Sequence, residues 1–241
     1  RTWQAVARAK LVELVGYPQE RPAPSGRNRT DHSMRDGFHR RRTYLRLWNG
    51  GDAPIDVIWY AETRPLPVMI CLQGTNSGSH LSWGEALLPP DPEKIFGGGD
   101  YARQAARQGY LAVCLEQSCF GERQERRLRP RSASPTIDAA NHAFLLGRSL
   151  IGERAGDVSS VVDWILADGA HRDLGLRIDR ERIFVMGSSA GGTVALYAAA
   201  LDERIGAVLA SGCLGFIRDT IARRRDDSGQ NVIPGILKWL E

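Results

Sequence analysis

The apolar residues of this chain fall into two kinds of pattern, one helical and one typical of strands. Residues 2–15 place apolar side chains at helical spacing and stop at a glycine and a proline, which predicts an N-terminal helix. Residues 42–48 and 55–61 alternate around an Asn-Gly-Gly-Asp turn, as the strands of an antiparallel hairpin do. Nearly continuous apolar runs, which predict strands covered on both faces of a parallel sheet, occupy residues 66–72, 110–115, 183–186 and 205–210.

Helical segments separate these apolar runs. Residues 101–108 lead into the second run, and a long helical stretch from about Ala139 to Leu166 leads into the third. Helices that alternate with buried strands after a hairpin predict an α/β fold with a doubly wound, mostly parallel sheet. We expect a single domain, in which residues 1–37 form a helix and an extended surface segment and residues 38–241 form the sheet core.

One apolar run leads directly into the motif G-x-S-x-G and then into an alanine-rich helix. The run ends at Met186, and Gly187, Ser189 and Gly191 are the fixed positions of the motif. Strand, motif and helix in this order are typical of a nucleophile elbow, in which a serine at strained backbone angles lies at the tip of the sheet. The two glycines allow neighbouring segments to approach closely. Ser189 is therefore the candidate nucleophile, and the following helix directs its free N–H groups toward it.

Other interpretations of this glycine-rich turn fit less well. One alternative is an ordinary βα turn, and another is a loop that binds phosphate. The segment from Gly187 to Thr193 lacks the lysine of a P-loop and has a serine where the dinucleotide motif needs its second glycine. The turn therefore favours acyl chemistry over nucleotide binding.

Composition narrows the partners and cofactors. The 241 residues are 42% hydrophobic and 25% charged, as in globular proteins, and no apolar run approaches the roughly 18 residues of a membrane span. The net charge is +4, but basic and acidic residues are interleaved, so we expect no nucleic-acid partner and no membrane partner. We expect no metal and no other cofactor, because no cluster of His, Cys and acidic residues has the spacing of metal ligands.

The cysteines and the N-terminus bear on the cellular compartment. Cys71, Cys114, Cys119 and Cys213 include no C-x-x-C pair, so we expect buried free thiols, whereas a disulfide would imply an oxidising compartment. The chain starts with Arg1 and shows no signal-peptide pattern. We therefore expect the native N-terminus to lie further upstream and favour a cytoplasmic location.

The order of hairpin, strands and elbow resembles that of α/β-hydrolases, over roughly residues 42–211. Three segments, residues 146–158, 187–192 and 200–204, resemble one branch of that superfamily, the acetyl xylan esterases and dienelactone-hydrolase-like proteins. This resemblance implies a serine hydrolase that cleaves a carboxylic ester through an acyl-serine intermediate. The ester would carry an acetyl or other short acyl group on a carbohydrate or another small molecule.

The resemblance also implies which groups form the oxyanion hole. One donor would be the N–H of Ala190, and the other an N–H from the loop that follows the strand ending at Leu72. In that loop we assign Thr75 as the donor and Gly74 as the residue that permits close approach. The His-Gly pair that usually opens this loop reads Gln73-Gly74 here.

The rest of the catalytic triad departs from the family pattern. In this fold the acid and the histidine follow the serine, yet all five histidines precede Ser189. His80 is the best upstream candidate for the base, because it follows the proposed oxyanion loop, but a loop histidine is more often a surface residue. Two further strands normally follow the run at 205–210. We therefore expect a C-terminally truncated hydrolase, with the triad acid and histidine beyond Glu241 and little activity in these residues alone.

Two other functions stay open at this point. A serine peptidase or amidase of the prolyl-oligopeptidase type shares the string at residues 187–192, but it would need a propeller domain that the roughly 40 residues before the first strand cannot form. A non-catalytic hydrolase-like scaffold would bind partners or small ligands without chemistry. The sequence does not indicate an oligomeric state or a lid.

Overall fold

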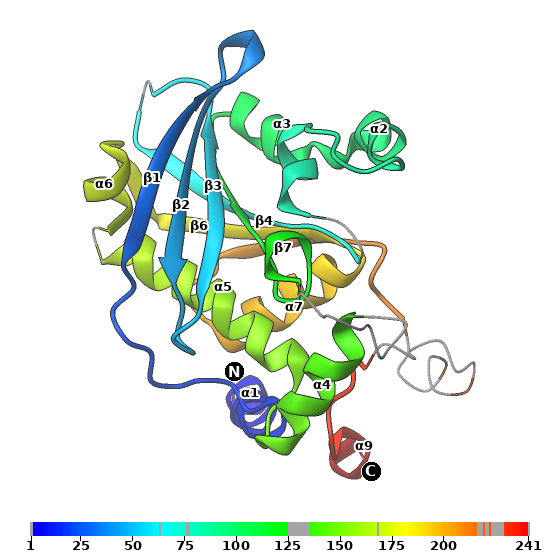
Figure 1. The fold of residues 1–241 in the computed structure, drawn as a ribbon. Helices are drawn as coiled ribbons and strands as arrows, with labels where there is room; N and C mark the ends of the chain where they lie inside the picture. The colour runs from blue at the N-terminus through cyan, green and yellow to red at the C-terminus, as the bar shows by residue number, and fades with distance from the viewer. Residues whose placement is uncertain are drawn as a thin grey trace.

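The computed structural model describes residues 2–62, 64–75, 78–124, 135–167, 169–215, 219, 222 and 229–240 (Figure 1). Their strands form one sheet in the order β1-β2-β3-β5-β4-β6-β7. The strands are β1 (Gly26–Ser33), β2 (His39–Arg46), β3 (Asp52–Trp59), β4 (Leu66–Leu72), β5 (Leu111–Leu115), β6 (Ile178–Ser188) and β7 (Ala207–Ser211). The helices are α1 (Thr2–Val15), α2 (Asp91–Lys94), α3 (Tyr101–Arg107), α4 (Pro135–Leu145), α5 (Leu150–Leu166), α6 (Gly169–Leu174), α7 (Ala190–Leu201) and α9 (Ile236–Leu240).

The sheet has a parallel half and an antiparallel half. Strands β5, β4, β6 and β7 run parallel, whereas β1, β2 and β3 pair antiparallel and β3 also pairs antiparallel with β5. The predicted α/β fold with an N-terminal hairpin is confirmed. The parallel half has its β4 between β5 and β6, so the residues after these three strands meet at one edge.

Strand β1 is an addition to the predicted architecture. Residues 26–33 were expected in an extended surface segment, but they pair with β2 and widen the hairpin to three strands. The strand is almost entirely polar and exposed, so it has no apolar alternation to reveal it. Partners from β2 hold it, since the Thr43 hydroxyl donates to the Arg27 carbonyl at 2.8 Å and Arg41 pairs with Asp31.

The long helical stretch before β6 is divided into α4 and α5. Gly147 has φ +68°, a left-handed value that ends α4. Ser149 then begins α5, because its hydroxyl accepts the N–H of Gly152 at 3.1 Å. Apolar periodicity continues through this break, which explains why the pattern predicted one helix.

Helices cover both faces of the sheet (Figure 1). The larger core lies between the sheet and the helices α1, α5 and α7, with the fully buried Trp164, Leu72 and Val185 among its members. The smaller core lies under α3 on the other face and includes Met69 and Tyr101. Within the part of the chain that the structure describes, no helix combines the length and apolar character that a membrane span requires.

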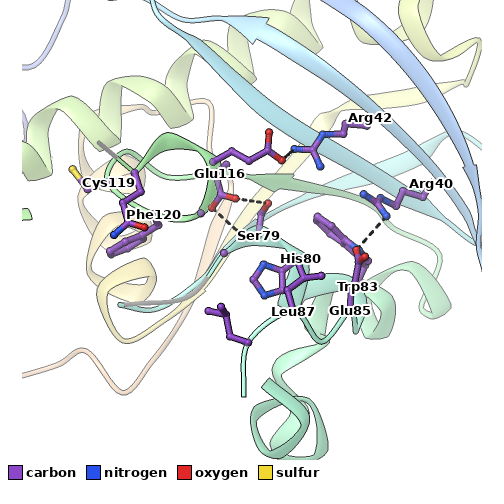
Figure 2. Close-up of a pocket in the computed structure, with 15 residues that line it drawn as sticks. Arg40, Arg42, Ser79, His80, Trp83, Glu85, Leu87, Glu116, Cys119 and Phe120 are labelled. Carbon is purple, nitrogen blue, oxygen red and sulfur yellow. Dashed lines mark hydrogen bonds and ion pairs between the residues drawn. The ribbon is translucent and has the colours of Figure 1, made fainter. Parts of the chain in front are cut away.

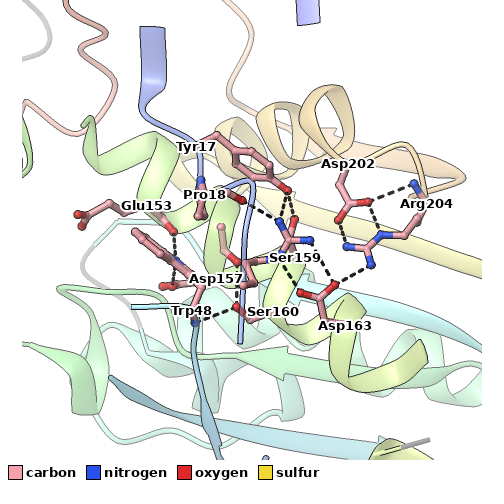
Figure 3. A network of polar contacts seen from close by, with 12 residues as sticks. Tyr17, Pro18, Trp48, Glu153, Asp157, Ser159, Ser160, Asp163, Asp202 and Arg204 are labelled. Carbon is pink, nitrogen blue, oxygen red and sulfur yellow. Dashed lines mark hydrogen bonds and ion pairs between the residues drawn. The ribbon is translucent and has the colours of Figure 1, made fainter. Parts of the chain in front are cut away.

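A polar network fastens α5 to the N-terminal segment and to the end of α7 (Figure 3). The Tyr17 hydroxyl and Ser159 are 2.6 Å apart, and Arg21 pairs with Asp163 at 2.6 Å. Arg204 pairs with the same Asp163 at 2.6 Å. These contacts hold α7, the helix that follows the G-x-S-x-G motif, in a fixed position behind the sheet.

Candidate active site

Ser189 lies at a sharp turn between β6 and α7. Its backbone angles are φ 51° and ψ −119°, a combination that is strained for any residue with a side chain. The strand ends at Ser188 and the helix begins at Ala190, so the turn has the strand-before and helix-after order of a nucleophile elbow. Ser189 is exposed, which leaves its hydroxyl accessible at the carboxyl edge of the sheet.

Two glycines allow the close packing around this turn. A Cβ on Gly187 would lie 2.3 Å from the backbone of Gly191, and a Cβ on Gly191 would lie 2.3 Å from the carbonyl oxygen of Leu72. Real Cβ atoms do not approach this closely, so both positions require glycine. The N–H of Ser189 also donates to the carbonyl of Ser211 at 2.7 Å, which ties the turn to β7.

The segment after β4 contacts the elbow directly. A Cβ on Gly74 would lie 3.3 Å from the Cβ of Ser189 and 3.2 Å from the carbonyl oxygen of Ser188. Ala190 is the first residue of α7, and an N–H at that position has no acceptor within its own helix. The structure thus brings the residues proposed for the oxyanion hole, Gly74 and Ala190, next to Ser189. Thr75 follows Gly74 and accepts a hydrogen bond on its hydroxyl from Gln230 at 3.3 Å.

Gln73 is the first residue after β4. Its side-chain amide donates to the hydroxyl of Ser82 at 2.8 Å and to the carbonyl of Gly99 at 3.0 Å. The Tyr101 hydroxyl donates to the neighbouring Leu72 carbonyl at 2.5 Å. The glutamine therefore fastens the end of β4 to residues 78–100, the segment between β4 and α3 that we call the insert.

None of the five histidines, all of which the structure describes, hydrogen-bonds to Ser189. His80, the upstream candidate, is buried, and its Nε2 lies 2.8 Å from Oδ2 of Asp91. The same Asp91 oxygen accepts the backbone N–H groups of Leu87 and Leu88 at 2.9 and 2.7 Å. Burial raises the pKa of Asp91, but these hydrogen bonds outweigh it, and the net pKa is lowered. The contact between His80 and Asp91 thus joins two parts of the insert.

A cavity of about 530 Å³ opens beside this insert (Figure 2). Its volume is within the range of about 300–1,000 Å³ that is common for small-molecule sites. It lies after β5, whose Cys114 forms one row with Cys71 of β4 and Met186 of β6. Because adjacent strands are about 4.8 Å apart, the ends of β5 and β6 are separated by about 10 Å. Lining residues include Arg40, Arg42, Ser79, His80, Trp83, Glu85, Leu87, Glu116 and Phe120.

The charges on the cavity wall are paired with one another. Arg40 contacts the fully buried Asp56 at 2.7 Å and Glu85 at 3.5 Å. Arg42 contacts Asp56 at 3.7 Å and also pairs with Glu122. Both arginines are thus neutralised by neighbouring carboxylates, so the wall presents hydrogen-bond donors and acceptors without a free cation for an anion, which suits a neutral polar group better.

Glu116 is a buried carboxyl group at the floor of this cavity. It accepts the backbone N–H of Ser79 at 3.0 Å and the Ser79 hydroxyl at 3.1 Å. Burial raises the pKa of Glu116 above its ordinary value, and the two bonds from Ser79 offset this only in part. Sequence reasoning did not select Glu116, although its position directly after an apolar parallel strand is the place where ligands bind in such sheets.

The described residues contain no cluster of candidate metal ligands and no disulfide. No group of three or more His, Cys, Asp or Glu side chains among those residues is placed to hold a metal ion. All four cysteines are free, and Cys71, Cys114 and Cys119 are buried. The expectation of free thiols is confirmed, except that Cys213 is partly exposed.

Comparisons with known proteins agree with this geometry. Residues 173–217, which hold β6, the elbow, α7 and β7, match the family model described as Acetyl xylan esterase (AXE1). A candidate acetyl xylan esterase from Bacteroides fragilis has a similar structure, with a TM-score of 0.74 and 21% identity over 99% of this chain and 62% of that one. No curated protein has a sequence that matches this chain significantly.

Two more solved structures share the fold. A glucuronoyl esterase from Solibacter usitatus has a TM-score of 0.59 and 16% identity over 95% of this chain and 65% of its own. An acetyl xylan esterase from a Paenibacillus species has a TM-score of 0.57 and 17% identity over 92% of this chain and 63% of its own. The chain spans less than two thirds of the length of these structures. It therefore has the α/β-hydrolase fold and, in the segment that carries the elbow, is similar to the acetyl xylan esterases.

Proposed function

We propose that this chain hydrolyses carboxylic esters through an acyl-serine intermediate on Ser189. The single observation that carries the proposal is the exposed serine at φ 51° and ψ −119° between β6 and α7. Strain of this kind is found where the surrounding structure enforces it, and it is typical of active sites. The match of this same segment to the acetyl xylan esterase family supports an ester as the substrate.

The proposed mechanism follows from the groups around Ser189. Its hydroxyl oxygen attacks the carbonyl carbon of the ester, and the negative charge develops on the carbonyl oxygen. The N–H of Ala190 and the N–H of Thr75 would hold that oxyanion, with Gly74 giving the loop room to approach. A base takes the proton of the serine hydroxyl and passes it to the leaving alcohol as the ester C–O bond breaks, and water then hydrolyses the acyl-serine to the free acid and Ser189.

The substrate class that we propose is a short acyl ester, such as an acetyl ester, of a carbohydrate or another small alcohol. Gly74 lies against Ser189, which leaves little room on that side for a long acyl chain. The cavity of about 530 Å³ after β5 lies at the same edge of the sheet and is the place we propose for the alcohol portion.

The proton acceptor for Ser189 is missing from the described contacts. All five histidines have been placed, and none hydrogen-bonds to this serine. A serine without its base keeps only the share of catalysis that comes from binding and the oxyanion hole, about 10³–10⁴ over water. We therefore propose that this chain turns over esters slowly.

Rescue by a soluble base tests the proposal. The wild-type chain and Ser189→Ala would be assayed on a short acyl nitrophenyl ester with and without added imidazole. We expect imidazole to accelerate the wild-type chain at least about 10-fold more than the variant, because it supplies the absent base. Equal rates for both proteins at every imidazole concentration would refute the acyl-serine mechanism.

A non-catalytic scaffold is the second candidate, and the placement of the histidines away from Ser189 is what favours it. A serine-directed phosphonate probe distinguishes the two functions. Covalent labelling of the wild-type chain, absent in Ser189→Ala, is expected for the esterase. A chain that stays unlabelled but binds small esters or sugars would be a scaffold.

A further inference from the structure

Gln117 contacts the loop that approaches Ser189. It follows β5 and is 3% exposed. Its side-chain Nε2 donates to the carbonyl oxygen of Gln73 at 2.5 Å, whereas its Oε1 is buried with no hydrogen-bond partner among the described residues. A buried acceptor without a partner is unfavourable, so an apolar side chain would serve better if only packing mattered. Packing alone therefore does not account for a glutamine at position 117, and its hydrogen bond to the Gln73 carbonyl does.

Gln230 contacts the same loop at its other end. Its Nε2 donates to the hydroxyl of Thr75 at 3.3 Å, and its Oε1 accepts Nη1 of Arg154 at 3.2 Å. Arg154 is 1% exposed and also donates to the carbonyl of Ser118 at 2.8 Å. Burial lowers the pKa of Arg154 to about 10, so the guanidinium remains charged at neutral pH. Because this cation fixes the amide oxygen of Gln230, the amide NH₂ group must face Thr75.

The two glutamines hold the segment that a catalytic oxyanion donor has to occupy. We call Gln73–Thr75 the oxyanion loop. Its central residue, Gly74, has the greatest backbone freedom of any residue type and packs against Ser189. A donor stabilises an oxyanion only when it lies about 2.7–3.1 Å from it, so rotation of the peptides on either side of Gly74 would abolish the effect.

We infer that Gln117 and Gln230 are positioning residues, which together fix the oxyanion loop against Ser189 by holding the Gln73 carbonyl and the Thr75 hydroxyl. This inference rests on the proposed function for its catalytic consequence. Its structural content, an oxyanion loop held in place by two side-chain amides, can be measured independently of hydrolysis. The two glutamines come from separate parts of the chain, so each can be removed without the other.

The first test measures the loop itself. Amide hydrogen exchange of a peptide that covers residues 70–75 would be compared in the wild-type chain, Gln117→Leu, Gln230→Leu and the control Gln104→Leu. Gln104 also donates to a backbone carbonyl, that of Gly98 at 3.2 Å, but it is exposed and belongs to α3. We expect the amides of this peptide to exchange about 10-fold faster in Gln117→Leu and Gln230→Leu, which we call the site variants, than in the wild-type chain. In the control, exchange should match that of the wild-type chain. Unchanged exchange in both site variants would overturn the inference.

The second test measures the catalytic consequence in the imidazole-rescued, Ser189-dependent reaction. We expect kcat to fall about 10- to 100-fold in Gln117→Leu and Gln230→Leu while KM changes less than about twofold, because ground-state binding is left intact. Gln117→Glu keeps the length of the side chain but donates a hydrogen bond only when protonated. Its kcat relative to the wild-type chain should therefore rise as the pH is lowered, which a loss of packing would not produce.

The outcomes separate the inference from the proposed function. The positioning role is overturned if the wild-type chain is active and the site variants have the same kcat. It is also overturned if kcat falls only in proportion to the melting temperature while exchange in the loop is unchanged. If the wild-type chain is no faster than Ser189→Ala, the proposed function fails, and the inference is then decided by loop exchange alone.

Discussion

Gly74 and Ser189 touch across the ends of two neighbouring parallel strands, β4 and β6, with 3.3 Å between the Cβ of Ser189 and the position a Cβ on Gly74 would take. A Cβ there would make a tighter contact than most Cβ atoms in proteins, yet it would not clash severely. Gly74 also has no positive φ. The reason for a glycine at this position is therefore its short distance to Ser189, and not a backbone conformation that only glycine adopts.

Replacement of Gly74 by alanine should reduce catalysis more than stability. The added methyl group must displace the oxyanion loop from Ser189 by a few tenths of an ångström, which we expect to lower kcat about 10-fold. Measurement of kcat in the imidazole-rescued reaction and of the melting temperature checks this. Gly97→Ala is the matched control, because a Cβ at Gly97 meets nothing within 4 Å. Equal kcat values for the two variants would contradict the expectation.

Replacement of Gly191 by alanine should, in contrast, cause a large loss of folding stability. A Cβ there would lie 2.3 Å from the Leu72 carbonyl oxygen and 2.6 Å from the Gln73 carbonyl oxygen, both of them backbone atoms that cannot rotate away. The helix α7 would have to move off β4, at a cost of about 3 kcal/mol or more. Urea unfolding of Gly191→Ala beside the control Gly97→Ala measures this cost. A variant within about 1 kcal/mol of the wild-type chain would show that the packing is looser than described.

The buried carboxyl of Glu116 should make stability depend on pH in a defined direction. Burial raises its pKa above the ordinary value of 4.5, so the folded chain binds this proton more tightly than the unfolded chain does. Folding stability then falls as the pH rises from 4.5 to the higher folded pKa, and it is level above that. Glu116→Gln lacks this dependence. The stability of the wild-type chain relative to Glu116→Gln should therefore decrease with rising pH in urea unfolding, and a rising difference would contradict the assignment.

Asp202 should show the reverse dependence. Burial raises the pKa of Asp202, but the hydrogen bonds and charge of Arg204 outweigh it and lower the net value below 3.8. Its contribution is therefore present above pH 3.8 and is lost as the pH falls through the lower folded pKa. Asp202→Asn should cost about 1 kcal/mol at neutral pH, since Arg204 is partly exposed, and less in acid. A cost that grows in acid would refute this linkage.

Strand β7 should make the chain self-associate. Among the described strands it pairs only with β6, and Leu209 on this edge is 60% exposed. An edge strand without charge or proline is a template for pairing with another chain. Leu209→Lys should lower the apparent mass in sedimentation velocity at high concentration. Leu145→Lys removes an equally apolar exposed residue from α4, so a similar effect of both variants would point to general stickiness instead of edge pairing.

The sequence by itself determined the features that depend on neighbouring residues. An apolar strand, two glycines flanking a serine and an apolar helix predict the elbow, and the structure places Ser189 at a sharp turn between β6 and α7. The same holds for the buried strand β4 and for the hairpin of β2 and β3, because side-chain alternation and turn residues act over a few positions. Strand β1 was missed because an exposed, polar edge strand buries nothing and leaves no apolar pattern.

Only the tertiary structure decided which distant residues contact the loop beside Ser189. Gln117 reaches Gln73 because β5 and β4 are neighbours in the sheet, and Gln230 reaches Thr75 from 155 positions away. His80, which the sequence left as a possible base, binds Asp91 instead. Local patterns specify strands and helices, whereas strand order and side-chain partners depend on how the whole core packs, and a single sequence carries no local signal for such long-range pairs.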